Sequence, residues 1–253
     1  MSERPITVAM IPARLESSRL PGKAILDIHG LPMIIHVYKR CLLAKSLDDV
    51  FVATDNEIIC DVVEGYGGKV IMTSPGHQTG TDRIAEAVAE LDVDIVVNVQ
   101  GDEALVNPAY IDKVVEEMQH DQSINVSILV NPFNKRNSVS DIKAVLDEDN
   151  NVMYFSRADI PSDARVSEPP MFKAYHIVPF RKDFLLQYAG WDKGRLEQIE
   201  FNEYLRILEK GYKIRAIIVE SDAMSVDTSD DLERVREMMK IDEWFPRYLN
   251  QVS

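Results

Sequence analysis

The chain has 253 residues, of which 45% are hydrophobic, and this is enough material for the core of one large α/β domain. Acidic residues outnumber basic ones by 42 to 28, and the formal net charge of −14 argues against nucleic acid or an anionic membrane as a partner. The apolar run at 6–11 is too short for the core of a signal peptide or for a membrane span, so we expect a cytoplasmic protein.

The first half of the chain alternates apolar runs of strand length with amphipathic segments of helix length. Strands are predicted at 6–13, 49–55, 69–73 and 94–100, and helices at 32–45, 56–68, 81–91 and 108–119. The first two helices would carry Cys41 and Cys60, which we expect to be reduced and buried. This alternation predicts a parallel sheet, and such sheets bind ligands beyond the carboxyl ends of their strands.

The pattern changes from about residue 124. Extended segments at 124–133, 143–161 and 172–182 are joined by turns rich in Asn, Asp and Pro, which is typical of antiparallel or mixed strands. Helical spacing returns at 196–211 and 229–239, with a strand predicted at 212–220. The predicted fold is therefore one α/β domain over 1–253, with a mostly parallel sheet covered by helices on both faces and a smaller mixed or antiparallel lobe at about 124–195.

A cluster of cations follows the first predicted strand. The segment "MIPARLESSRLPGK" at 10–23 contains Arg14, Arg19 and Lys23, together with small and rigid residues that let backbone N–H groups approach a ligand. Arginine forks and a lysine point charge suit phosphate oxygens, so the segment is interpreted as a phosphate-binding loop. The alternative is a solvated basic turn. The chain has neither GxxxxGK[ST] nor a GxGxxG after this strand, which disfavours P-loop and dinucleotide-binding proteins.

Two aspartates also follow apolar strands. Asp102 comes one glycine after the strand at 94–100, and Asp227 lies between the strand at 212–220 and the next helix. Carboxylates at this edge of a sheet suit Mg²⁺, which often bridges protein carboxylates to substrate phosphates. The alternatives are a turn role for Asp102 and a helix N-cap at Asp227 or Thr228.

The segment "HQTGTDRIAEA" at 77–87 opens a predicted helix that Thr79 or Thr81 could cap. Arg83 would lie in the first turn of this helix, where the helix dipole favours acidic residues, so a ligand anion could account for it. His77 could be catalytic or simply a polar loop residue, and no nucleophile is near it in the sequence.

The motifs together resemble one family along almost the whole chain. The segments "IPARLESSRLPGKAI", "HQTGTDRIAEA", "VVNVQGDEALV", "VMYFSRADIP" and "VDTSDDLERVR" follow, in order, the pattern of the 3-deoxy-manno-octulosonate (Kdo) cytidylyltransferases, the CMP-Kdo synthetases of lipopolysaccharide assembly. The resemblance implies a Rossmann-like nucleotidyltransferase fold and the transfer of CMP from CTP to a small acidic sugar, with release of pyrophosphate and help from Mg²⁺. It also implies a homodimer.

The resemblance assigns roles to residues of this chain. It implies that the triphosphate is bound by Arg14, Ser18, Arg19 and Lys23, and that catalysis depends on Lys23, Arg14, Arg19 and Asp102. The rest of the nucleotide would be bound by Gln78, Thr81 and Arg83. The metal would be held by Asp102 and Asp227, and the sugar would be contacted by Gln100 and Arg157.

The acceptor side departs from the family pattern. The span "AYHIVPFR" has Ala174 and Val178 where a sugar-facing His and Tyr are usual. The stretch "NEYLR" keeps Glu203 but has Tyr204 in place of Gln, and we expect Glu203 and Tyr204 to bind the acceptor. Because lost hydrogen-bonding groups can discriminate strongly between substrates, the acceptor could be an amino or deoxy variant of Kdo, another 2-keto sugar acid or a phosphonate. The alternative is that the pocket still takes Kdo. His176 could replace the expected His if the strand were shifted.

Two other classes remain as alternatives: a nucleotide-binding protein without turnover, and a dinucleotide-dependent oxidoreductase, which the missing glycine motif disfavours. The aromatic residues Phe172, Tyr175 and Phe180 could line the dimer interface or belong to the core.

Overall fold

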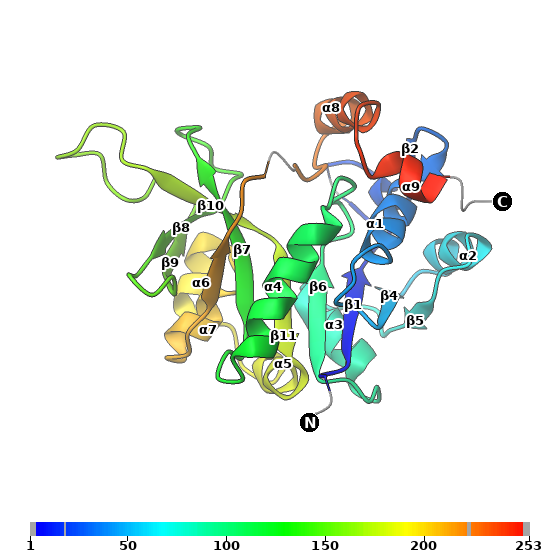
Figure 1. Cartoon of the computed structure of the whole chain (residues 1–253), viewed down its shortest axis with the longest axis horizontal. Coiled ribbons are helices and arrows are strands. Elements are labelled where there is room, and N and C mark those ends of the chain that lie inside the picture. The colour runs from blue at the N-terminus through cyan, green and yellow to red at the C-terminus, as the bar shows by residue number, and fades with distance from the viewer. Residues whose placement is uncertain (1–3, 18, 222–223, 250–253) are drawn as a thin grey trace. The chain divides into compact units, whose positions relative to one another are not determined.

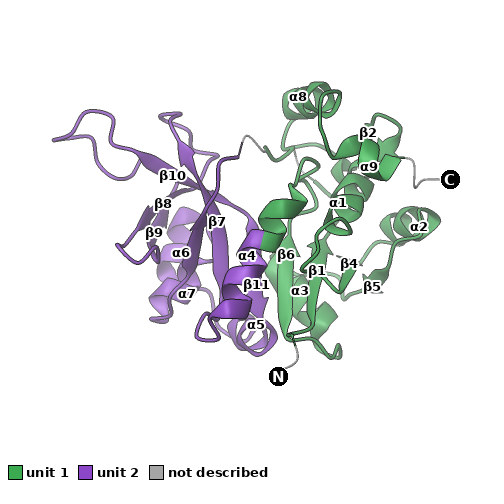
Figure 2. Cartoon of the chain, in the orientation of Figure 1, with its two compact units in different colours: residues 1–112, 222–253 green, residues 113–221 purple. Residues whose placement is uncertain are grey.

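The structure is a computed structural model that describes residues 4–17, 19–221 and 224–249. The chain divides into two compact units, the first formed by 1–112 with 222–253 and the second by 113–221 (Figure 2). The lobe predicted at 124–195 falls within the second unit. In the described part of the chain, no helix is both long enough and apolar enough to cross a membrane.

The first unit contains a parallel sheet whose strands run in the order β6-β1-β4-β5 (Figure 1). These strands are β1 (Thr7–Pro12), β4 (Asp49–Thr54), β5 (Val70–Met72) and β6 (Ile95–Val99). All of β6, and β1 apart from its last residue, are buried, as expected of continuous apolar strands between helices. The unit also has the short elements η1 (Lys23–Ile25), β2 (Asp27–Ile28) and β3 (Leu31–Pro32), and the helices α1 (Met33–Cys41), α2 (Glu57–Gly65), α3 (Gly80–Val88), α8 (Ser229–Met239) and α9 (Phe245–Leu249).

Side chains cap the helices that border the predicted site. Thr79 is the N-cap of α3 and accepts from the backbone N–H of Asp82, so of the two threonines it is Thr79 that caps. Thr228 caps α8 in a capping box with Asp231. The N-cap role considered for Asp227 is therefore filled by its neighbour.

The second unit is built on a mixed sheet of order β12-β7-β10-β8-β9. The β12–β7 pair is parallel, and the pairs β7–β10, β10–β8 and β8–β9 are antiparallel. The elements are β7 (Ser127–Phe133), β8 (Lys143–Leu146), β9 (Val152–Ser156), β10 (Met171–Tyr175), β11 (Ile177–Arg181), β12 (Arg215–Ile218), α5 (Lys182–Ala189), α6 (Arg195–Glu200) and α7 (Leu205–Glu209); α4 (Pro108–His120) begins in the first unit and ends in the second. The predicted α/β class, with a parallel sheet and a second, mixed sheet, is confirmed; the mixed sheet has five strands and is not the smaller of the two, as the sequence had suggested.

One predicted helix is wrong in its extent. The segment 196–211 forms α6 and α7 with a break between them, because Phe201 adopts a left-handed backbone with φ of 50°. A non-glycine residue in that conformation ends an α-helix. The periodicity of the sequence continues through the break, so it gave no sign of it.

The aromatic residues considered for an interface have different surroundings in the chain. Tyr175 and Phe180 are buried in the second unit, and Phe172 is half-buried. Cys41 in α1 is buried and Cys60 in α2 is half-buried, and both are free thiols. Burial raises the pKa of Cys41, so its thiol stays protonated.

A buried ion pair supports the helices of the second unit. Arg206 Nη2 lies 2.6 Å from Glu197 Oε1, and Arg206 Nε donates to Glu197 Oε2 at 2.8 Å. The guanidinium also lies over the ring of Tyr188, 4.6 Å from its centroid. Both charged side chains are 6% exposed or less, so neither can be hydrated if its partner is lost.

We therefore expect Glu197→Gln to lower the free energy of unfolding by about 3–5 kcal/mol, because the change removes the carboxylate charge that faces a buried guanidinium. Urea unfolding followed by circular dichroism measures this. The control is Glu237→Gln, which removes one partner of the exposed Lys240–Glu237 pair and should change stability little. Equal stabilities for the two variants would contradict the expectation.

Candidate active site

The loop after β1 carries the three predicted cations. Gly22 begins η1 with φ of 68°, a left-handed conformation that glycine adopts without strain, and its N–H donates to the carbonyl of Leu15 at 3.2 Å. The N–H of Lys23 donates to the carbonyl of Leu20 at 3.2 Å. The loop is thereby folded back, which brings Lys23 to the carboxyl end of β1 beside Arg14 at the cavity described below.

Asp102 lies beside this loop, and the glycine before it suits the close approach of the chain there. A Cβ on Gly101 would stand 3.0 Å from the carbonyl oxygen of Pro12 and 3.3 Å from Ile34, so any other residue would require the end of β1 or Ile34 to move by a few tenths of an ångström. Asp102 Oδ2 then lies 2.6 Å from Lys23 Nζ.

Asp227 reaches the same place from the far end of the sequence. The N–H of Val226 donates to the carbonyl of Asp102 at 3.1 Å, which ties the two aspartate segments together. Asp227 Oδ1 accepts from Arg19 Nη2 at 2.8 Å and lies 3.5 Å from Lys23 Nζ. Residues separated by more than 200 positions therefore form one network of charges.

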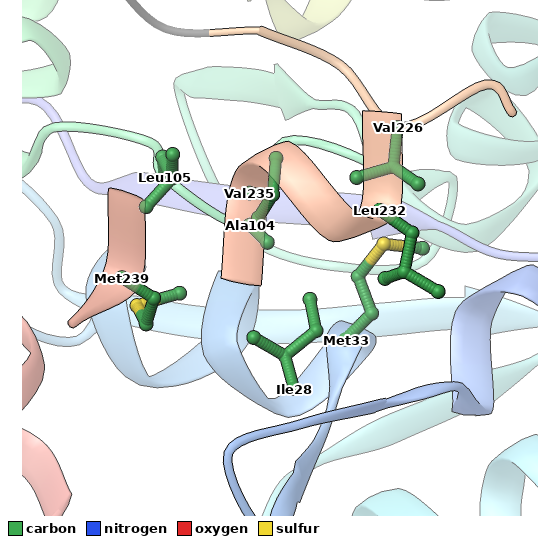
Figure 3. Packing of buried hydrophobic residues seen from close by; sticks show 8 residues of the cluster. All are labelled: Ile28, Met33, Ala104, Leu105, Val226, Leu232, Val235 and Met239. Carbon is green, nitrogen blue, oxygen red and sulfur yellow. The ribbon is translucent and has the colours of Figure 1, made fainter. Parts of the chain in front are cut away.

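An apolar cluster holds these segments in place (Figure 3). It packs Ile28 and Met33, which follow the basic loop, against Ala104 and Leu105 of the Asp102 loop and Val226 beside Asp227. The cluster is completed by three residues of α8: Leu232, Val235 and Met239. Burial of each larger side chain contributes roughly 1.5–3 kcal/mol, so the cluster can offset the cost of bringing like charges together.

A cavity of about 270 Å³ opens in the first unit at this point. Most of the predicted nucleotide and metal residues line it, together with Gln100, which was predicted for the sugar: Arg14, Arg19, Lys23, Gln78, Arg83, Asp102 and Asp227. The cavity also has lining residues that the sequence interpretation did not assign, among them Glu16, Ser17 and His77. Ser18, predicted to bind the triphosphate, lies outside the described residues.

Two predicted nucleotide residues have protein partners of their own. Arg83 is 5% exposed, lies 3.1 Å from Asp55 Oδ2 and donates to Thr73 Oγ1 at 2.6 Å, so a carboxylate of the chain accounts for a cation in the first turn of α3. Thr81 is fully buried and is not among the described residues that line the cavity. Its hydroxyl accepts from Asn98 Nδ2 at 3.2 Å, while Asn98 Oδ1 accepts from Gln100 Nε2 at 2.9 Å.

This network fixes the side-chain amide of Gln100, which lines the cavity, through Asn98 and Thr81 behind it.

Asp55 was not singled out from the sequence. It follows β4 directly, at the same edge of the sheet as the other site residues, and that position is the signal by which it could have been found.

The donor set fits a magnesium ion. Asp102 and Asp227 each offer a carboxylate oxygen within 3.5 Å of the Lys23 ammonium, and both side chains are partly exposed, at 24% and 32%. Among the described residues there is no group of three or more His, Cys, Asp or Glu that could hold a metal by itself. Mg²⁺ is usually bound by one or two carboxylates and completed by substrate phosphates and water, so two aspartates beside a basic loop are sufficient.

The predicted acceptor residues of the second unit have structural contacts. Arg157 Nε donates to the carbonyl of Glu200 at 3.0 Å, and its Nη atoms donate to the carbonyls of Val139, Ser140 and Phe201 at 2.9–3.3 Å. The sugar contact implied for Arg157 would have to compete with these bonds. In the structure this guanidinium braces the turn at 139–140 against the end of α6.

The two stretches that depart from the family pattern meet in the second unit. His176 stacks on Tyr204 with ring centroids 6.1 Å apart and an angle of 27° between the planes. Ala174 stays in register opposite Val130, and both Ala174 and Val178 are buried. Tyr204 is 3% exposed, and Glu203 accepts from the hydroxyl of Tyr188 at 3.4 Å.

Comparison with known proteins agrees with the geometry. A model of the cytidylyltransferase family matches residues 8–214. The chain belongs to the cytidylyltransferase family. An 8-amino-3,8-dideoxy-manno-octulosonate cytidylyltransferase of Shewanella sediminis is 40% identical over 240 residues, and a 3-deoxy-manno-octulosonate cytidylyltransferase of Geotalea uraniireducens is 41% identical over 246; each alignment covers 92% of this chain and 98% of the relative.

A solved structure also resembles the chain along its length. It is a CMP:2-keto-3-deoxy-manno-octonic acid synthetase in complex with CTP, 36% identical, with a TM-score of 0.90 over 93% of this chain and 99% of that protein. The resemblance noted from the motifs is therefore confirmed, and the chain is a nucleotidyltransferase of the cytidylyltransferase family with the fold of a CMP-Kdo synthetase.

Proposed function

We propose that this cytidylyltransferase transfers CMP from CTP to a 2-keto sugar acid of the Kdo type and releases pyrophosphate. The observation that carries the proposal is the convergence of Arg19, Lys23, Asp102 and Asp227 in one charge network at the edge of the parallel sheet. The names of relatives at 40–41% identity support this class of acceptor.

The chemistry requires little more of the protein than position and charge. An oxygen of the acceptor attacks the α-phosphorus of CTP, and negative charge develops on the phosphate oxygens and on the leaving pyrophosphate. Arg14, Arg19 and Lys23 stand where they can neutralise this charge, and their loop is fixed by backbone hydrogen bonds before the substrate arrives. Gln100, held by Asn98, is a further polar contact for the substrate.

Asp102 and Asp227 are the residues that would hold Mg²⁺. The metal would supply positive charge to the phosphates, in addition to that of Arg14, Arg19 and Lys23. We also propose, from the resemblance, that the enzyme acts in the cytoplasm as a homodimer.

The acceptor itself is the finer part of the proposal. The relatives include enzymes named for Kdo and for 8-amino-Kdo at almost the same identity, so overall similarity does not choose between them. The stacked His176–Tyr204 pair places aromatic side chains at positions where the family pattern has other types of residue. We propose a Kdo-type acid as the acceptor, with 8-amino-Kdo as the first variant to test.

We expect CTP-dependent pyrophosphate release with Kdo or 8-amino-Kdo and Mg²⁺, and its loss in excess chelator. A panel of these two acids, sialic acid and a simple phosphonate, measured as kcat/KM for each, tests the proposal. Efficient use of the phosphonate in preference to both octulosonates would contradict the proposed acceptor class. CTP binding without turnover on any acceptor would make the chain a nucleotide-binding protein instead.

A further inference from the structure

His77 lies at the edge of the cavity and is held by a carboxylate. Its Nε2 contacts Glu86 Oε2, and its side chain is 19% exposed. The other oxygen of Glu86 accepts from the backbone N–H and the hydroxyl of Ser74, at 2.8 and 2.9 Å. Glu86 therefore ties the loop between β5 and α3, which contains His77, to the last turn of α3.

The contact determines which nitrogen of His77 is available to a ligand. The hydrogen bond from the Ser74 N–H lowers the pKa of Glu86, and the smaller effects of the hydrogen bonds from His77 and the Ser74 hydroxyl act in the same direction. This carboxylate is therefore ionised and can only accept hydrogen bonds. Nε2 of His77 must then carry a proton. Nδ1 is left as the second polar atom of the ring, and in the described part of the chain it has no hydrogen-bond partner.

The charges around His77 differ from those around Lys23. At the Lys23 end, the cavity is lined by the cations Arg14, Arg19 and Lys23 and by Asp102 and Asp227, the two carboxylates that would hold Mg²⁺. At the His77 end, Arg83 is already paired with Asp55, and Glu86 adds a further negative charge. With the metal bound, a triphosphate is therefore favoured at the Lys23 end and disfavoured at the His77 end.

The order of the strands separates these two ends. Asp102 follows β6, whereas Ser74 follows β5, and in the order β6-β1-β4-β5 these strands are three spacings apart, roughly 14 Å. A nucleotide with its triphosphate over the basic loop and the aspartates would extend its nucleoside toward the β5 side, where Glu86 holds His77.

We propose that His77 is a nucleoside-binding residue, oriented by Glu86 so that Nδ1 forms a hydrogen bond with the base or ribose of the bound nucleotide. This inference rests on the proposed function, since it takes the cavity as a nucleotide site. It assigns to His77 a role in affinity for the nucleoside and none in holding the triphosphate.

Two substitutions at His77 separate this role from a structural one. In His77→Gln the side-chain amide reaches the place of Nε2, so the bond to Glu86 can be kept while the group at Nδ1 is lost. In His77→Asn the amide lies near the place of Nδ1 instead. We expect His77→Gln to weaken binding of CMP and CTP by about tenfold, the value of one hydrogen bond, and to leave binding of inorganic tripolyphosphate unchanged. His77→Asn should recover part of the CMP affinity.

Titration calorimetry of the full chain with CMP, CTP and tripolyphosphate measures these effects, and His120→Gln at the exposed end of α4 is the matched control, with no expected change. Unchanged CMP affinity in His77→Gln, or an equal loss for tripolyphosphate, would overturn the role of His77 while leaving the proposed function standing. A wild-type chain that binds neither CMP nor CTP would overturn both. If the Gln variant does not fold, the ¹⁵N resonance of His77 Nδ1 in the wild type decides, since it should shift on addition of CMP.

Discussion

Replacing Asp102 by asparagine is expected to lower kcat by roughly 10²-fold or more. The carboxylate lies 2.6 Å from Lys23 Nζ and is one of two that could hold Mg²⁺. Asparagine keeps the size of the side chain and one oxygen but removes the negative charge on which both the metal and the position of Lys23 depend. Steady-state pyrophosphate release with saturating CTP and acceptor measures the effect.

The control for this variant is Asp92→Asn, an exposed aspartate of the same unit that is outside the cavity lining. The two variants should unfold at similar temperatures, because Asp102 is itself partly exposed. A near-normal kcat for Asp102→Asn would remove Asp102 from the mechanism. A low kcat that excess Mg²⁺ restores fully would assign to it metal affinity alone.

The residues around Lys23 could be found from the sequence because they follow a simple rule of topology. Arg14 and Asp102 follow β1 and β6, and the ends of these neighbouring parallel strands meet at one edge of the sheet. Asp227 also follows an apolar run, but that run forms β12 of the second unit's mixed sheet, so its place depends instead on the hydrogen bond from Val226 to Asp102. What the strand pattern does not contain is the apolar cluster that joins the segments. Its members come from β2, the start of α1, the loop after β6, the segment before α8 and α8 itself, and their contacts appear only in three dimensions.

The residues whose surroundings could not be predicted are those held by backbone groups or by distant partners. Arg157 binds carbonyls of two turns, and sequence patterns contain no signal for carbonyl direction. Arg83 in α3 has Asp55 as its partner, an aspartate 28 positions away that comes directly after β4. The break of the predicted helix at Phe201 depends on one left-handed residue of a type that seldom adopts this conformation.

The ion pairs of the site have a consequence for how it binds its ligands. Lys23 lies within 2.6 Å of Asp102 and 3.5 Å of Asp227, so the cation that suits the triphosphate also neutralises the carboxylates that suit the metal. Each carboxylate that binds a metal must give up part of its contact with Lys23, and Lys23 is then available to phosphate. Nucleotide and metal should therefore each bind more tightly when the other is present.

Substitution of Lys23 by methionine should change the two affinities in opposite directions. CTP loses a phosphate contact, so its dissociation constant should rise by about tenfold or more. In the absence of nucleotide, the affinity for a divalent cation should instead increase several-fold, because Asp102 and Asp227 no longer share an ammonium group. Titration with Mn²⁺ followed by electron paramagnetic resonance measures the metal affinity, and titration with CTP by calorimetry measures the nucleotide affinity.

The control is Lys240→Met, which removes an exposed lysine of the same unit and should change neither affinity. If Mn²⁺ binding weakens together with CTP binding, Lys23 does not compete for the carboxylates, and the idea of a shared charge network fails while the phosphate contact remains.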